Sequence, residues 1–209
     1  MDLMGIANRM IAAVYKRGVV IFASAGNQRA NVSQDDSFKI WPAGSKAETI
    51  GATGPCCVAC DGNPLNDHYD LLAVYSNFGF SQMETNYFVM PAGQRLEGCS
   101  YPTPNLCQVL TPLGILPRPC QVFDMVWTTS LQNAGALLGR YIPFSGTSAS
   151  AAQASGLAAL ILSRYPNFKV GQLTDAIHGN GGIDLTEDIG DPGYDALFGY
   201  GRGNAALIP

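Results

Sequence analysis

The sequence predicts an α/β fold built on a mainly parallel sheet, and three observations support this. Residues 4–16 carry apolar side chains at the three- and four-residue spacing of an amphipathic helix, which Gly18 ends. Residues 19–23 form an apolar run without alternation, which is typical of a parallel strand buried on both faces. The composition agrees, because only 13 % of the 209 residues are charged and 47 % are apolar. A helix, a short turn and a buried strand form one unit of a wound α/β sheet.

Further elements are expected in order along the chain. We expect strands at 47–53, 71–75, 87–90 and 125–129, and helices at 147–164 and 169–178. Because residues 147–164 are nearly all small or apolar, we expect that helix to be buried on all sides. Five prolines between Cys99 and Cys120 predict a surface loop with no regular element. Nothing in the sequence divides the chain, so residues 1–209 are expected to form part of a single domain.

Charge and hydropathy exclude several classes of protein. Lys and Arg total 12 against 16 Asp and Glu, a formal net charge of −4, so no basic stripe is available for a nucleic acid. The low charge and high apolar content exclude a disordered chain. The most apolar stretch, residues 149–162, is too short to span a bilayer. The first residues do not have the pattern of a signal peptide. We therefore expect neither a nucleic-acid partner nor a membrane partner.

The cysteines indicate an oxidising location. An even number in loop-like sequence favours disulfides, so we expect a secreted protein or another oxidising compartment. Free thiols, a metal site and a redox site are the alternatives. A zinc site would need a second pair of ligands beside the CxxC spacing at 57–60. The six are Cys56, Cys57, Cys60, Cys99, Cys107 and Cys120.

The first motif that carries chemistry lies at the end of the expected strand at 19–23. Asn27 follows the small residues Ala23, Ser24, Ala25 and Gly26. Ligands of open α/β sheets bind beyond the carboxyl ends of the strands, so Asn27 is well placed to contact one. Small side chains allow a substrate backbone to approach closely. The alternative is that these residues only pack tightly inside the fold.

The second motif, Ser-Gly-Thr-Ser at 145–148, precedes the small-residue helix and places Ser148 in its first turn. The positive end of the helix dipole and the unpaired backbone N–H groups there stabilise an alkoxide or an oxyanion. The alternative is that Thr147 or Ser148 is an N-cap, as most serines before helices are.

Together the two motifs resemble those of the subtilisin-like serine peptidases, or subtilases. Further segments resemble that family in its order, so the likeness covers most of the chain: Trp41-Pro42-Ala43, Thr49–Thr53, Tyr75–Gly79, Val89–Gly93, Tyr165-Pro166-Asn167 and Gly199–Ala205. Ala152 stands where the family usually has proline, and Gln153 where histidine is common. Residues near 55–70 and 98–141 look like loop insertions.

The resemblance implies a three-layer αβα fold and a serine endopeptidase. Ser148 would be the nucleophile, which forms an acyl-enzyme with a polypeptide substrate. Asn27 would donate its amide to the oxyanion, and residues 23–26 would form part of the substrate cleft. No cofactor is assigned, although structural calcium is frequent in the family.

The base and the acid of the family's triad are missing. Both motifs precede the oxyanion asparagine in subtilisins, and no DTG-like or HGT-like segment occurs in the 209 residues. His68 and His178 match neither motif, and we expect a surface or capping role for each. The resemblance therefore implies the C-terminal portion of a catalytic domain, with a sheet incomplete on its N-terminal side. Its partner would be the missing N-terminal half, and the isolated chain would have little activity.

Three other interpretations stay open at this point. A noncatalytic subtilase-like domain would bind a peptide or a partner chain. A sedolisin-like peptidase would also have the serine motif, but its oxyanion residue is an aspartate where this chain has Asn27. An α/β hydrolase would need a GxSxG elbow, and Gly146-Thr147-Ser148-Ala149-Ser150 lacks the second glycine.

Overall fold

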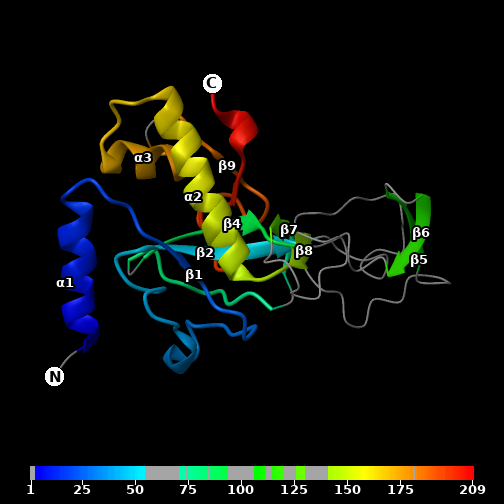
Figure 1. Cartoon of the computed structure of the whole chain (residues 1–209). Helices are drawn as coiled ribbons and strands as arrows, with labels where there is room; N and C mark the ends of the chain where they lie inside the picture. The colour runs from blue at the N-terminus through cyan, green and yellow to red at the C-terminus, as the bar shows by residue number, and fades with distance from the viewer. Residues whose placement is uncertain are drawn as a thin grey trace.

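The structure is a computed structural model that describes residues 3–54, 71–73, 75–83, 85–93, 106–111, 114–119, 126–129, 141–180 and 182–209. Figure 1 shows the arrangement of the elements. Its helices are α1 (Leu3–Tyr15), α2 (Thr147–Arg164) and α3 (Val170–Ile177), with two short 3₁₀ turns at Asp36–Phe38 and Ala205–Leu207. Its strands are β1 (Phe22–Ser24), β2 (Glu48–Gly54), β3 (Leu71–Leu72), β4 (Asn86–Pro91), β5 (Leu106–Thr111), β6 (Gly114–Pro119), β7 (Val126–Thr129), β8 (Tyr141–Phe144), β9 (Thr186–Glu187) and β10 (Arg202–Gly203).

The main sheet is mostly parallel, as the sequence predicts. Its strands lie in the order β1-β2-β4-β10-β9, and β3 pairs with β2. The pairs β1–β2, β2–β4 and β4–β10 are parallel, whereas β3 and β9 join antiparallel. All seven residues of β2 are buried, which is the pattern of a strand covered on both faces.

Helices cover both faces of this sheet, so the three-layer αβα prediction is confirmed. On one face, Tyr87 and Val89 of β4 share a core with Ile11 of α1. On the other face, Phe88 and Met90 pack against α2 and α3. The alternation along β4 is the period of two expected of a strand. Figure 1 shows α2, in yellow, crossing the sheet.

Most expected elements lie within two residues of their predicted bounds, but two expectations are wrong. Helix α2 has the predicted bounds, yet it is not buried on all sides, because Leu160 is 51 % and Leu162 is 37 % exposed. Small side chains mark a helix that can pack closely, but they do not show how many of its faces are covered.

The second correction concerns residues 99–120, which were expected to be loop. Strands β5 and β6 form an antiparallel hairpin there, with Pro117 opposite Gln108 and Pro119 opposite Leu106. Residues two apart in a strand direct their backbone N atoms toward the same edge. In a two-stranded hairpin this edge can be the one that faces away from the partner strand, so the N–H groups that the prolines lack are not needed for pairing. The insertion expected at 98–141 therefore contains regular structure, including β7.

Several predictions fall on residues that the structure does not describe. His68 and the expected insertion at 55–70 lie outside the described residues, as do five of the six cysteines; of Cys107 only the backbone is described. The disulfides and the oxidising location therefore stay predictions. Within the described residues, no helix combines the length and the apolarity that a membrane crossing requires.

Candidate active site

The structure brings the two sequence motifs together at the carboxyl end of β1. Asn27 follows this strand, and its side-chain Oδ1 accepts hydrogen bonds from the backbone N (3.0 Å) and Oγ1 (2.9 Å) of Thr147. Thr147 is the first residue of α2 and immediately precedes Ser148. Residues 120 positions apart thus form one site.

Thr147 locks the two motifs together, a role that the sequence analysis missed. Its side chain is fully buried, and its hydroxyl accepts a hydrogen bond from the Gly26 N–H at 3.2 Å while it donates to Asn27. The N-cap of α2 is Gly146, which supplies no side-chain cap, so the alternative of a Thr147 or Ser148 cap is wrong. Asn27 caps the helix from a different segment, with the acceptor that the first N–H groups of a helix need.

The same hydrogen bonds fix which way the Asn27 amide points. Because Thr147 N is a donor, the atom that faces it must be the carbonyl Oδ1, and Nδ2 is left as a donor on the other side. A side-chain carbon at Gly146 would lie 3.4 Å from this Nδ2. Gly146 also has a φ of 128°, where a side chain is strained. The backbone conformation therefore favours glycine at the turn that precedes Ser148, whereas the 3.4 Å spacing would be an ordinary contact.

Ser148 is exposed in the first turn of α2. Among the described residues, nothing hydrogen-bonds its hydroxyl or its backbone N–H. Both groups lie at the positive end of an 18-residue helix, so an oxyanion held there would meet a favourable potential. Asn27 is exposed as well, so both donors are open to a ligand.

The small residues before Asn27 are built into the fold. Ala23 and Ala25 are buried in the core that contains Ile11, so a contact with substrate would have to use their backbone. The Ala25 N–H donates to the Ile50 carbonyl at 2.9 Å, which extends the β1–β2 pairing. A side-chain carbon at Gly26 would lie 2.5 Å from Asn77 Nδ2, so only glycine fits there. Ser24 is half-buried at the end of β1.

His178 lies at the other end of the sheet. It is the C-cap of α3, as its place before Gly179 predicts, but it is buried and not on the surface. Its Nε2 lies 2.8 Å from Oε2 of Glu48, and its ring stacks on Tyr200 with centroids 4.4 Å apart. Glu48 is the first residue of β2, whereas Asn27 follows the last residue of the parallel β1. His178 therefore cannot act as the base of Ser148.

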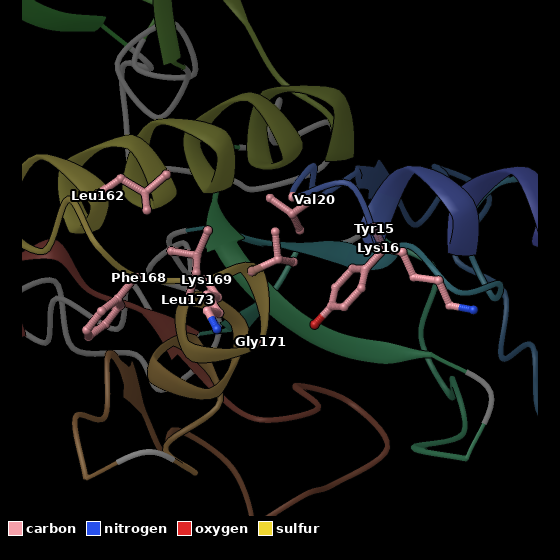
Figure 2. A pocket seen from close by; sticks show the side chains of 10 residues that line it. Tyr15, Lys16, Val20, Leu162, Phe168, Lys169, Gly171 and Leu173 are labelled. Carbon is pink, nitrogen blue, oxygen red and sulfur yellow. The ribbon is translucent and has the colours of Figure 1, made fainter.

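A cavity of about 420 Å³ also lies away from Ser148 (Figure 2). It is lined by the C-terminal ends of α1 and α2 and by the start of α3, with Tyr15, Val20 and Phe168 among its walls. Val20 precedes β1, so the cavity is at the opposite end of that strand from Asn27. Metal ligands are likewise not gathered in the described part of the chain, where no three His, Cys, Asp or Glu side chains are grouped to hold an ion.

The mainly parallel sheet, its covering helices and the paired motifs are those of a subtilisin-like fold. The model of the subtilase family matches residues 4–201, so this chain belongs to the subtilase family.

Curated relatives and solved structures agree with this family. The calcium-dependent proteases of Trichormus variabilis and of a Nostoc species are each 28 % identical over 194 residues, which is 90 % of this chain and 24 % of the relative. The chain thus spans about a quarter of the length of these relatives. A lanthipeptide protease structure has a TM-score of 0.69 at 25 % identity, over 99 % of this chain and 54 % of that one. The epidermin leader peptide processing serine protease of Staphylococcus aureus shares the fold, with a TM-score of 0.64 at 18 % identity, over 96 % of this chain and 42 % of that one.

Proposed function

We propose that this chain carries the nucleophile and the oxyanion-binding groups of a serine endopeptidase. Ser148 is the nucleophile, and the Asn27 side chain and the Ser148 backbone N–H bind the oxyanion. One observation carries the proposal: Asn27 holds the first turn of the helix that presents Ser148, through two hydrogen bonds to Thr147. This contact ties the residue that carries the amide donor to the helix turn that carries the hydroxyl, and it uses neither of those two groups, which supports the proposal.

The chemistry follows from these groups. Ser148 Oγ adds to the carbonyl carbon of a peptide bond, and its proton passes to a base. The carbonyl oxygen becomes an oxyanion that accepts hydrogen bonds from Asn27 Nδ2 and the Ser148 N–H. The C–N bond then breaks, the amine leaves with a proton from the same base, and an acyl-enzyme remains. Water hydrolyses this ester and frees Ser148. The backbone of residues 23–26 forms part of the substrate cleft.

The base and its orienting acid come from outside this chain. This part of the proposal rests on the sequence, which lacks both motifs, and on the place of His178 away from Ser148. The supplier we propose is the N-terminal half of the same catalytic domain, which would complete the sheet. The isolated chain then has little or no peptidase activity.

Two surfaces support a missing partner of this kind. Among the described residues β1 pairs only with β2, so its other edge is free. The outer face of α2 carries Ala152, Ser155, Gly156 and Ala159 at helical spacing, all exposed. A side-chain carbon at Gly156 would meet no atom within 4 Å. A helix glycine weakens a helix by about 1 kcal/mol relative to alanine, and a close neighbour on this face would explain its presence.

Calcium binding and an oxidising location rest on other observations. The names of the two curated relatives state calcium dependence for those proteins. The described residues do not fit a calcium site, because they contain no group of carboxylates that could form one. No step of the reaction is routed through calcium. The even number of cysteines supports a secreted protein.

Peptide hydrolysis by the full-length protein tests the proposal. Ser148→Ala should lower kcat by at least about 10³-fold, because it removes the attacking oxygen. Ser163→Ala is the matched control, since that serine is exposed on the same helix and its hydroxyl donates to the Leu160 carbonyl of that helix. Equal losses in both variants, or none in Ser148→Ala, would show the proposal to be wrong. If the wild type binds peptide and never hydrolyses it, the protein is the noncatalytic subtilase-like domain that binds a peptide or a partner.

A further inference from the structure

The segment Tyr75–Phe78 lies along the loop that carries Asn27. The Asn77 N–H donates to the Gly26 carbonyl (3.0 Å), the Arg29 N–H donates to the Tyr75 carbonyl (2.8 Å), and the Phe78 N–H donates to the Ala30 carbonyl (3.0 Å). Ser76 ties the segment to the sheet, because its Oγ accepts the Ala52 N–H of β2 at 3.1 Å. The oxyanion loop is therefore held by a neighbour that is itself fixed to β2.

The Asn77 side chain also hydrogen-bonds the loop that carries Asn27. It is fully buried, and its Oδ1 accepts the N–H groups of Gln28 (3.0 Å) and Ala30 (3.1 Å), which follow Asn27. Its Nδ2 donates to Oε1 of Gln28 (3.0 Å) and to the Phe38 carbonyl (3.2 Å). All four hydrogen-bonding positions of the amide are used. A buried amide satisfied in this way specifies one conformation of the loop.

The Tyr75 side chain reaches the other half of the site. Its hydroxyl accepts the Gly146 N–H at 3.0 Å and donates to the Gly93 carbonyl, two residues beyond β4. Gly146 is the N-cap of α2, two residues before Ser148. Because the Gly146 N–H can only donate, the phenol O–H of Tyr75 must donate to the Gly93 carbonyl. Tyr75 thus fixes the turn before the nucleophile to the end of β4.

We propose that Tyr75 and Asn77 form a positioning strap, in which Asn77 fixes the Asn27 loop and Tyr75 fixes the turn before Ser148. The proposal rests on the proposed function, since it states how that site keeps its geometry. Neither residue touches the reacting atoms. Their work is to keep the Asn27 amide and the Ser148 hydroxyl in register, where a displacement of about 1 Å can lower the rate by about 10²-fold.

Tyr75→Phe in the full-length protein tests the strap. It removes one hydroxyl and leaves the Gly146 N–H and the Gly93 carbonyl without this partner. We expect kcat for peptide hydrolysis to fall roughly 10- to 100-fold with little change in KM, because the loss acts on geometry and not on substrate binding. Amide hydrogen exchange at Gly146 should become at least about tenfold faster.

Tyr194→Phe is the matched control. The Tyr194 hydroxyl donates to the Phe80 carbonyl at 2.9 Å and contacts neither motif. This control should lose a similar amount of stability while its kcat and its exchange at Gly146 stay at the wild-type values. Equal kcat and equal Gly146 exchange in the two variants would overturn the strap.

Asn77→Ala tests the contact between the strap and the Asn27 loop, and amide hydrogen exchange is measured at Gln28 and Ala30. Faster exchange confined to these amides supports the strap, and unchanged exchange overturns it. These exchange measurements do not depend on catalysis, so they separate the two proposals. If Ser148→Ala leaves hydrolysis intact, the proposed function fails, while exchange at Gly146 and Ala30 still decides whether the strap holds the two segments.

Discussion

Asn27 has two side-chain atoms with two different tasks. Its Oδ1 holds the start of α2 through Thr147, and its Nδ2 is the proposed oxyanion donor. The sequence indicates the donor only through its resemblance to the oxyanion motif of the subtilases. It does not indicate the bond to Thr147, because residues so far apart in sequence are paired only by the fold. Thr147 is adjacent to Ser148, the proposed nucleophile, and that adjacency is the only signal of its role in the sequence.

Asn27→Asp separates the two tasks. The carboxylate keeps an acceptor for Thr147 but replaces the amide donor with a second acceptor. We expect kcat to fall by roughly 10²–10³-fold, the loss known for one oxyanion donor in a subtilisin. The free energy of unfolding should stay within about 0.5 kcal/mol of the wild-type value. Kinetics and urea unfolding check the two expectations, and an unchanged kcat would remove Asn27 from the oxyanion site.

Burial raises the pKa of Tyr75 to about 12, which gives its hydroxyl a readout in alkaline solution. The folded state keeps this phenol neutral, so its contribution is intact below pH 10 and is lost as the pH rises to about 12. Between pH 10 and about 12, the unfolding free energy of Tyr75→Phe should therefore fall less than that of the wild type. Part of the decline remains, because burial also raises the pKa of Tyr87 and Tyr194.

Urea unfolding at several pH values measures this slope. Tyr141→Phe is the control, because Tyr141 is 53 % exposed on β8. If the unfolding free energy changed equally with pH in Tyr75→Phe and Tyr141→Phe, burial of the Tyr75 hydroxyl would be contradicted.

At the scale of elements, Gly156 gives a prediction about what covers α2. If another segment packs on the outer face of this helix, Gly156→Leu should lower the unfolding free energy of the full-length protein by about 1–3 kcal/mol. If water covers that face, the substitution should instead stabilise by up to about 1 kcal/mol, because leucine is a better helix former. Thermal unfolding decides the sign. Gly171→Ala in α3 is the control, since its added carbon meets nothing closer than 3.9 Å.

The buried pair of Glu48 and His178 ties α3 to the start of β2. Their facing oxygen and nitrogen lie 2.8 Å apart and have no hydrogen-bond partner among the described residues, and both side chains are 3 % exposed. His178→Ala removes a buried ring that stacks on Tyr200 and leaves Glu48 Oε2 without its facing group, so it should cost about 2–5 kcal/mol of unfolding free energy. Asp36→Ala, which removes an 83 % exposed carboxylate from its pair with the half-buried Lys39, should cost less than about 1 kcal/mol. Similar urea midpoints for both variants would contradict this role.

The elements also show what a sequence can predict and where it stops. The bounds of α2 follow from local signals: a glycine before it, a proline after it and small residues between. The β5–β6 hairpin was missed because a high density of prolines predicts a loop. The spacing of two between Pro117 and Pro119, which is compatible with one edge of a strand, was not taken into account. A surface or capping role was expected for His178; the capping role is confirmed, but its burial was missed because its partners, Glu48 and Tyr200, are remote in sequence. Capping and periodicity are local properties, whereas burial depends on the packing of distant segments.

The whole molecule has the fold of the subtilase family. The family match covers residues 4–201, yet the chain spans only 24 % of its curated relatives and 54 % of the lanthipeptide protease structure. Within the described part of the chain, one edge of β1 is unpaired and the outer face of α2 is exposed, and an additional strand and helix there would extend the same layers. We expect the triad base and acid to come from that extension.

The most direct test of this account is to locate a fluorophosphonate adduct by mass spectrometry. The probe should label Ser148 in the full-length protein, because its base and oxyanion donors are assembled there. The isolated chain should show little or no labelling, since it has the nucleophile without the base. Strong labelling of Ser148 in the isolated chain would contradict the missing base. An intact, folded full-length protein labelled at another serine would contradict Ser148 as the nucleophile.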